Sequence, residues 1–189
     1  MVERKTLYFE KPGKQNTEAL LKIVKKYAES TGVRDIVVAS TLGGTGAAAS
    51  KLFKGYNVVV VTHCTGFSEL GAQELKAEHR RKILKNGAKL FTGTHALSSV
   101  ERAIRKVFGT VEPLELIANT LRLMGEGTKV CVEITLMAAD AGLIPMERDV
   151  VAIAGTGKGA DTALLIKPAN AARFFDLKIR EIIAKPRDF

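Results

Sequence analysis

The chain has 189 residues, 46% hydrophobic and 26% charged, which is the composition of a folded globular protein and excludes a disordered or fibrous one. It has no apolar run near the ~20 residues that span a bilayer, and its start, Met1 to Thr6, has no signal-peptide core. We therefore expect one cytoplasmic domain over residues 1–189 without membrane contact. The net charge of +9 favours an anionic partner.

Helices and strands alternate in the first third of the chain. The spacing of apolar residues predicts an amphipathic helix from Asn16 to Ser30. The β-branched run from Asp35 to Thr41 is typical of a strand buried on both faces. A small-residue helix over Ala47–Phe53 and a valine-rich strand over Asn57–Thr62 repeat the unit.

The middle of the chain continues the alternation. Helical spacing of Leu75, His79 and Ile83 predicts a third helix, and a short third strand follows. Beyond it we expect two more helices, the first begun by a capping box. These elements are the strand Ala88–Thr92, the helix that Ser98 and Glu101 cap and Gly109 ends, and the helix from Pro113 to Met124.

The segment from Lys129 to Ala141 fits both a strand and a helix, and we interpret it as a helix because helical spacing persists longer. Three further strands are predicted at Asp149–Ala154, Thr162–Lys167 and Leu177–Ala184, with a helical turn near Ala171. Strands that alternate with helices imply right-handed crossovers and a three-layer α/β/α sandwich with a mostly parallel sheet.

Four predicted strands end in loops that combine glycine with hydroxyl side chains. They are Ser40–Gly46, Thr62–Phe67, Thr92–His95 and Gly155–Gly159. In an open α/β sheet, ligands bind beyond the carboxyl ends of the strands. Glycine lets the backbone approach a ligand, free N–H groups at a helix start favour anions, and hydroxyls donate to phosphate. The candidate cofactor-binding residues are Ser40, Thr41, Gly43, Gly44, Thr45, Gly46, Thr62, His63, Thr65, Gly66, Phe67, Gly93, Thr94, Gly155, Thr156 and Gly157.

The competing interpretation is that tight strand-to-helix turns need glycine anyway, but four converging turns favour an anion site. Neither strict phosphate motif is present. The first loop lacks the Gly-Lys-Ser/Thr of a P-loop and contains no GxGxxG, and Gly155–Gly159 lacks the first glycine at P-loop spacing.

Single residues give weaker signals for chemistry. His63 and His95 follow strand ends and are candidates for ligand contact, whereas His79 lies in a helix stripe and fits a packing or surface role. Cys64 could be a nucleophile or a buried thiol. Spacing alone assembles no catalytic triad and no metal site, and a carboxylate pair of Asp140 and Asp161 has no fixed distance. Cys64 and Cys131 are isolated, which argues against structural zinc or a disulfide framework.

Charge and composition also bear on the partners and the source. The basic residues mostly lie between apolar positions of predicted helices, as Arg80, Arg81 and Lys82 do, and we interpret them as solvated helix faces rather than a nucleic-acid surface. A nucleic-acid partner would show affinity that falls steeply with salt. The apolar helices are compatible with a homo-oligomer. Few glutamines, no tryptophan and many Lys and Glu favour a heat-adapted source.

Two stretches resemble a known family. Ile36-Val-Val-Ala-Ser-Thr-Leu-Gly-Gly-Thr-Gly-Ala47 with its following strand, and Val150-Val-Ala-Ile-Ala-Gly-Thr-Gly-Lys-Gly159, resemble the C-terminal domain of pyruvate kinases. In that domain such a loop holds the phosphate of an allosteric sugar phosphate. The resemblance covers roughly residues 16–167. Because 189 residues cannot hold the (β/α)₈ barrel beside this domain, we expect no pyruvate kinase activity from the chain.

The sequence looks closer still to a stand-alone archaeal group of pyruvate kinase C-terminal-like proteins, on Tyr8-Phe-Glu-Lys-Pro-Gly-Lys-Gln-Asn-Thr17 and Thr62-His-Cys-Thr-Gly-Phe67. This resemblance implies strand order 3-2-1-4-5 with the last strand antiparallel. It also implies flavin mononucleotide (FMN) as ligand, with the phosphate on residues 41–46 and the flavin or ribityl chain near residues 62–67.

Two functions therefore lead. The first is an FMN-binding protein with a role as an oxidoreductase, and the alternative is a regulatory module that senses a sugar phosphate or nucleotide. The sequence names no reaction and no catalytic residue.

Overall fold

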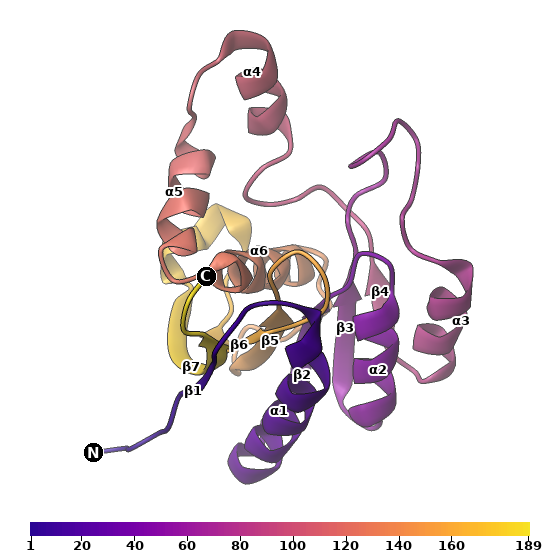
Figure 1. The fold of residues 1–189 in the computed structure, drawn as a ribbon, viewed down its shortest axis with the longest axis vertical. Helices are drawn as coiled ribbons and strands as arrows, with labels where there is room; N and C mark the ends of the chain where they lie inside the picture. The colour runs from indigo at the N-terminus through magenta and orange to yellow at the C-terminus, as the bar shows by residue number, and fades with distance from the viewer.

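The computed structural model describes residues 1–189, and its seven strands join one sheet of order β1-β7-β6-β5-β2-β3-β4 (Figure 1). The strands are β1 (Leu7–Phe9), β2 (Asp35–Ala39), β3 (Asn57–Val61), β4 (Lys89–Phe91), β5 (Val150–Ala154), β6 (Thr162–Lys167) and β7 (Lys178–Pro186). The pairings of β5 with β6 and of β6 with β7 are antiparallel and all others are parallel, so only β6 runs against the rest.

This topology confirms the predicted α/β class and its mostly parallel sheet. The expected order 3-2-1-4-5 is present as β4-β3-β2-β5-β6, with the last of these strands antiparallel. The sheet continues beyond it through β7 and β1, which the five-strand order omitted. β1 escaped prediction because it has only three residues, of which Leu7 and Tyr8 are exposed.

Helices cover both faces of the sheet. They are α1 (Thr17–Thr31), α2 (Gly44–Leu52), α3 (Ala77–Lys85), α4 (Val100–Phe108), α5 (Pro113–Arg122) and α6 (Glu126–Asp140), with 3₁₀ turns η1 (Lys14–Asn16) and η2 (Ala171–Asp176). The ambiguous segment after Lys129 is helical, as predicted. No helix is both long enough and apolar enough to cross a membrane.

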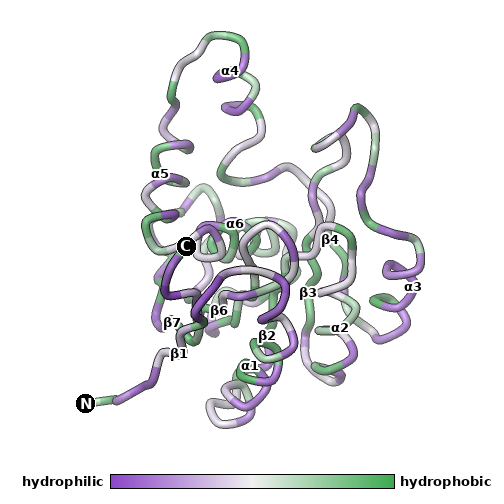
Figure 2. The backbone as a smooth tube through the Cα atoms, in the orientation of Figure 1, coloured by the Kyte–Doolittle hydropathy of each residue, from purple (hydrophilic) through white to green (hydrophobic).

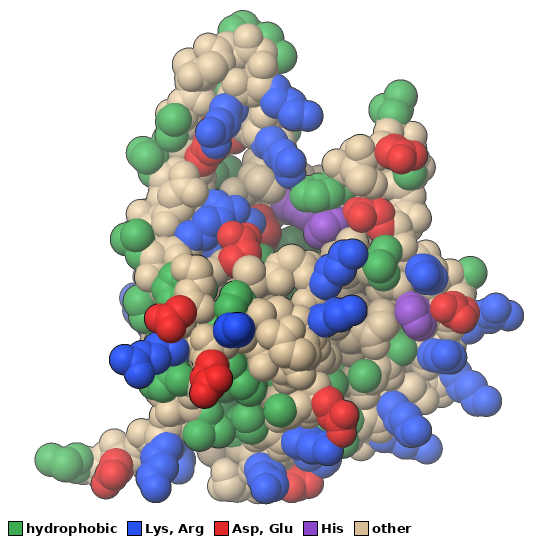
Figure 3. Space-filling model, in the orientation of Figure 1, with side chains coloured by type: hydrophobic (Ala, Val, Ile, Leu, Met, Phe, Trp, Pro, Cys, Tyr) green, Lys and Arg blue, Asp and Glu red, His purple; other side chains and the backbone are tan.

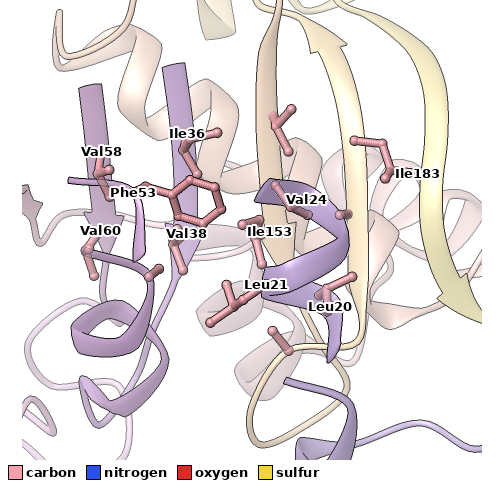
Figure 4. Close-up of a cluster of buried hydrophobic side chains, with 14 of the residues drawn as sticks. Leu20, Leu21, Val24, Ile36, Val38, Phe53, Val58, Val60, Ile153 and Ile183 are labelled. Atoms are coloured by element: carbon pink, nitrogen blue, oxygen red, sulfur yellow. The ribbon is translucent and has the colours of Figure 1, made fainter. Parts of the chain in front are cut away.

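Successive strand side chains point to opposite faces of the sheet, so the core has two layers. Ile36 and Val38 of β2 point with Val58 and Val60 of β3 toward α1, α2 and α3, where Phe53 fills the centre (Figure 4). The intervening strand residues pack on the other face against α5 and α6, whose buried side chains include Ala118, Val132 and Leu136. Figure 2 shows the central strands as hydrophobic segments between these helices. Burial on both faces explains why β2 and β3 read as continuous apolar runs.

Several helix starts differ from the prediction: α3 begins at Ala77, beyond Leu75, and α6 begins at Glu126 rather than Lys129. α2 begins at Gly44 rather than Ala47, so Gly44, Thr45 and Gly46 form its first turn. The capping box of Ser98 and Glu101 is wrong, because the N-cap of α4 is Ser99 and no side chain caps it. Glu101 instead accepts hydrogen bonds from the backbone N–H groups of Leu114 and Glu115, at 2.9 and 3.3 Å, and thereby caps α5. That contact ties α4 to α5 in an arm that projects beyond the sheet (Figure 1).

Candidate functional site

A cavity of about 1360 Å³ lies at the carboxyl ends of β2, β3 and β5. Its walls come from the loops after these strands, from α6, and from the α4–α5 arm. In the space-filling view the molecule is hollowed between this arm and the segment that follows β3, and histidine side chains lie in the hollow (Figure 3). Ligand cavities for drug-sized molecules are commonly about 300–1,000 Å³, so this one has room for a nucleotide-sized ligand.

The loop after β2 presents free backbone donors to the cavity. The N–H of Gly46 donates to Ser40 Oγ at 2.9 Å, and that of Ala47 to the Gly43 carbonyl. The N–H groups of Gly44 and Thr45 have no protein acceptor, and both residues line the cavity. These are the unsatisfied donors of a helix start, where the helix dipole also favours negative charge.

Glycine is required here for packing as much as for a ligand. Gly43 has φ 93°, and a Cβ on it would lie 2.5 Å from His79 Cβ. A Cβ on Gly46 would lie 2.5 Å from Val60 Cγ1, so Gly46 lets α2 approach β3. Both are buried beneath the cavity wall, whereas a Cβ on Gly44 would meet only His79 Cε1, at 3.7 Å. Gly44 is therefore the glycine of this loop that faces open space.

Two side chains of the segment after β3, those of His63 and Glu74, form a series of polar contacts with Thr41 of the loop after β2. Glu74 Oε2 lies 2.8 Å from His63 Nδ1, and His63 Nε2 lies 3.2 Å from Thr41 Oγ1. All three residues line the cavity. Sequence spacing missed Glu74, because an irregular segment separates it from the strand end that holds His63.

An aromatic wall adjoins these contacts. The ring of Phe67 lies 4.1 Å from the His63 ring and 5.1 Å from the His95 ring, centroid to centroid. The guanidinium of Arg102, from α4, lies over Phe67 at 4.8 Å. The rings are tilted by 34–61° to one another, and they offer aromatic surface to an aromatic ligand group.

His95 is neutral in this wall. The backbone N–H of Cys64, rather than its thiol, donates to His95 Nε2 at 3.2 Å, so the ring proton is on Nδ1. Burial lowers the pKa of His95 below its ordinary value, while the Glu133 charge opposes that shift. A neutral imidazole here leaves the positive charge of the cavity to lysine and arginine.

The loop after β5 is held by a buried carboxylate. Asp161 accepts hydrogen bonds from the N–H groups of Gly13 and Thr156, at 2.8 and 3.1 Å, and from the Thr162 hydroxyl at 2.8 Å. Asp140 contacts Asn170 and Ala171 instead, so the two aspartates form no carboxylate pair. No group of three or more His, Cys, Asp and Glu side chains is arranged to hold a metal.

The structure brings part of the predicted site together. Nine of the sixteen candidate residues line the cavity: Ser40, Thr41, Gly44, Thr45, Thr62, His63, Phe67, Gly155 and Gly157. Seven do not: Gly43, Gly46, Thr65, Gly66, Gly93, Thr94 and Thr156. Gly93 packs against the Phe91 ring, Thr94 is exposed outside the cavity, and Thr156 turns its backbone to Asp161.

Basic side chains from α4, α5, α6, η1 and two loops are the part that sequence reasoning missed. The cavity is lined by eight Lys or Arg residues and five Glu residues: Lys14, Lys76, Arg102, Arg105, Lys106, Arg122, Lys129 and Lys158, with Glu74, Glu101, Glu115, Glu126 and Glu133. Each glutamate is bound to an arginine, a lysine, a histidine or a helix start. Lys14, Lys76, Lys106 and Lys158 form no ion pair with the protein. The cavity therefore carries an excess of positive charge.

One ion pair of the wall is buried. Lys129 and Glu133, both of α6 and each 6% exposed in the side chain, bond to each other. Glu133 also accepts a hydrogen bond from the Leu97 N–H at 3.0 Å. Since a buried charge persists only when it is paired, this pair fixes the loop after β4 to α6.

A three-layer α/β domain with a positively charged cavity at the carboxyl ends of its parallel strands is the class that this fold and site define. Residues 18–166 match the family model described as pyruvate kinase, alpha/beta domain. The match covers most of the chain, and the chain belongs to this family.

Several solved structures are similar to the chain. A pyruvate kinase from Cryptosporidium parvum has 15% identity and a TM-score of 0.39, over 79% of this chain and 22% of that one. A pyruvate kinase of that organism in complex with ADP has 17% identity and a TM-score of 0.38, over 79% of this chain and 22% of that one. NAD+ synthetase from Burkholderia pseudomallei has 19% identity and a TM-score of 0.37, over 75% of this chain and 52% of that one. The chain thus spans about a fifth of the pyruvate kinases it matches, and similarities of this size indicate neither a ligand nor an activity.

Proposed function

We propose that the chain binds a phosphorylated small molecule, FMN, in the cavity, with the phosphate at the start of α2. The observation that carries the proposal is the pair of unpartnered N–H groups of Gly44 and Thr45, which open with Thr41 into a cavity with excess positive charge. Helix starts of this kind bind phosphate through backbone donors and the helix dipole.

Two features of the rest of the cavity support a flavin as the ligand. Its volume of about 1360 Å³ exceeds the need of a phosphate alone, and the ring of Phe67 with the neutral imidazole of His95 gives a surface on which a flavin ring can stack. Gly159, the neighbour of Lys158, has φ 77° and lets the Lys14 backbone pack against it, and both lysines line the cavity. These lysines would balance the charge of the phosphate. A bound flavin would supply hydride or electron transfer, and these residues would bind and orient it.

The proposal also covers the class of protein to which the chain belongs and its activity. The likeness of Tyr8–Thr17 and Thr62–Phe67 to the stand-alone archaeal group supports a flavoprotein of that group, acting as an oxidoreductase in the cytoplasm. Scarce glutamine supports a heat-adapted source.

Loss of a lysine from the cavity tests the electrostatic part of the proposal. We expect Lys158→Ala to weaken FMN binding roughly 5- to 10-fold, equivalent to ~1–1.4 kcal/mol. Quenching of flavin fluorescence measures the affinity, and added inorganic phosphate should compete with FMN. Lys54→Ala is the matched control, because Lys54 lies beyond the other end of α2 and outside the cavity. Equal affinity in all three proteins would contradict the proposal.

The alternative, a module that senses a sugar phosphate, uses the same helix start and differs in the aromatic wall. Its support is the polar α5 wall, where Asn119 lines the cavity beside Arg122, to which it bonds at 3.0 Å. Phe67→Ala should weaken FMN binding and leave a sugar phosphate unaffected. Tight sugar phosphate binding without FMN binding would decide for this alternative.

A further inference from the structure

Thr41, His63 and Glu74 have the arrangement of a hydroxyl group activated by a base, with the base oriented by a carboxylate. The distances are 3.2 Å from Thr41 Oγ1 to His63 Nε2 and 2.8 Å from His63 Nδ1 to Glu74 Oε2. Phosphate binding needs neither the imidazole–carboxylate contact nor its alignment with a hydroxyl.

The direction of these hydrogen bonds follows from chemistry. An ionised carboxylate only accepts, so His63 Nδ1 carries the ring proton and donates it to Glu74. In the neutral ring Nε2 is then unprotonated and accepts from the Thr41 hydroxyl. This is the tautomer in which an imidazole removes a proton from a nucleophile.

The surroundings suit acyl transfer. Thr41 lies at the turn between β2 and α2, half-buried, and its side chain lines the cavity together with His63 and Glu74. His63 and Glu74 are 32% and 24% exposed in the side chain, so a substrate can reach the relay while the carboxylate stays largely shielded. The unpartnered N–H groups of Gly44 and Thr45 line the same cavity and are the donors available to a developing oxyanion.

We propose that Thr41 is the nucleophile and His63 the general base of an ester hydrolase site, with Glu74 as the positioning residue. The substrate class is a carboxylic ester that carries an anionic group, because lysines without acidic partners line the cavity. The inference rests on the proposed function for the anion-binding character of the cavity. It uses the same Gly44 and Thr45 N–H groups and the same Thr41, so a bound FMN phosphate and an ester substrate would compete for them.

The reaction balances without a further reactant except water. Thr41 Oγ1 forms a bond to the ester carbonyl carbon while its proton passes to His63 Nε2. The bond from that carbon to the alcohol oxygen breaks, and His63 returns the proton to the departing oxygen. Water then attacks the acyl-threonine with His63 as base, which releases the carboxylic acid and restores the Thr41 hydroxyl.

The test uses the full chain and two chromogenic probes, 4-nitrophenyl acetate and the anionic 4-nitrophenyl hemisuccinate. We expect a burst of 4-nitrophenolate, an acyl group that peptide mass analysis places on Thr41, and faster turnover of the hemisuccinate. Thr41→Val, which keeps the shape and removes the hydroxyl, should lose at least ~100-fold in kcat, as should His63→Gln, while Thr41→Ser should retain activity. Glu74→Gln should lower kcat with KM unchanged, which a merely structural defect would not do.

Ser30→Ala, which removes an exposed hydroxyl near the end of α1 and outside the cavity, is the control and should behave as the wild type. Acyl groups found only on lysines or on Cys64, or full activity of Thr41→Val, would overturn the inference. FMN affinity of the same variants, measured in parallel, separates the two proposals. FMN binding without acylation of Thr41 overturns this inference alone, and acylation without FMN binding overturns the proposed ligand alone.

Discussion

His95 shows how burial sets the charge of a single side chain in the cavity. Its backbone N–H and carbonyl both bond to Ser99 Oγ, at 2.9 and 3.0 Å, which holds the residue against the wall. Burial keeps the pKa of the imidazole below the ordinary value of 6.5, with Glu133 acting in the opposite direction and His63, Lys129 and Arg102 in the same direction.

This shift predicts how stability depends on pH. Because the folded state disfavours the charged ring, the unfolded chain takes up a proton first as the pH falls below about 6.5. The contribution of His95 to stability is therefore present above that pH and is lost below it. We expect the free energy of unfolding of wild type relative to His95→Gln to decrease from pH 7.5 to pH 5.5 in urea titrations. A difference that stays constant or grows would contradict the assigned shift.

For single residues, position along the chain predicted which side chains line the cavity, but not which side chains they bond to. His63 and His95 follow strand ends, which made them candidates for ligand contact, and both line the cavity. The pairing of His63 with Glu74 depends on the path of an irregular segment, and no periodicity encodes that path.

Among the elements, α6 depends on close approach to the sheet. Gly127 lies in its first turn and is buried, and a Cβ there would lie 2.1 Å from Thr162 Oγ1 and 2.4 Å from Thr162 Cβ. Because Gly127 has no side chain, α6 can pack closely on β6 at this point.

We expect Gly127→Ala to destabilise the protein by about 1–3 kcal/mol, because overpacking outweighs the ~1 kcal/mol gain in helix propensity. Chemical denaturation measures the change. Gly44→Ala is the matched control, since its Cβ would meet only His79 Cε1 at 3.7 Å, and it should leave stability within ~0.5 kcal/mol of wild type. An unchanged midpoint for Gly127→Ala would show that the contact is not tight.

The α4–α5 arm marks the limit of prediction at the scale of elements. Its two helices follow from apolar spacing and Pro113, but α4 has no buried residue, so no apolar stripe indicates where it packs. Its position depends on the bonds of Glu101 to the start of α5 and on the ion pair of Arg105 with Glu115. The basic side chains that this arm contributes to the cavity were therefore outside the reach of sequence patterns.

For the whole molecule, the fold was predictable because the burial of the central strands leaves a pattern in the sequence. The central strands are buried on both faces, which produces the β-branched runs that identified β2, β3 and β5. Peripheral strands such as β1 carry exposed side chains and leave no such pattern. The convergence of the strand-end loops followed from parallel topology, whereas the charge of the cavity required the three-dimensional arrangement of helices and loops.

Calorimetric titration with FMN and with riboflavin decides whether a phosphate binds at the start of α2. FMN should bind to wild type and to Gly44→Ala, because that Cβ points into open space, and riboflavin should bind at least ~10-fold more weakly. Gly44→Asp should abolish FMN binding, since its carboxylate would occupy the helix start and repel the phosphate. Equal affinities for FMN and riboflavin, or an unaffected Gly44→Asp, would contradict a phosphate site at α2.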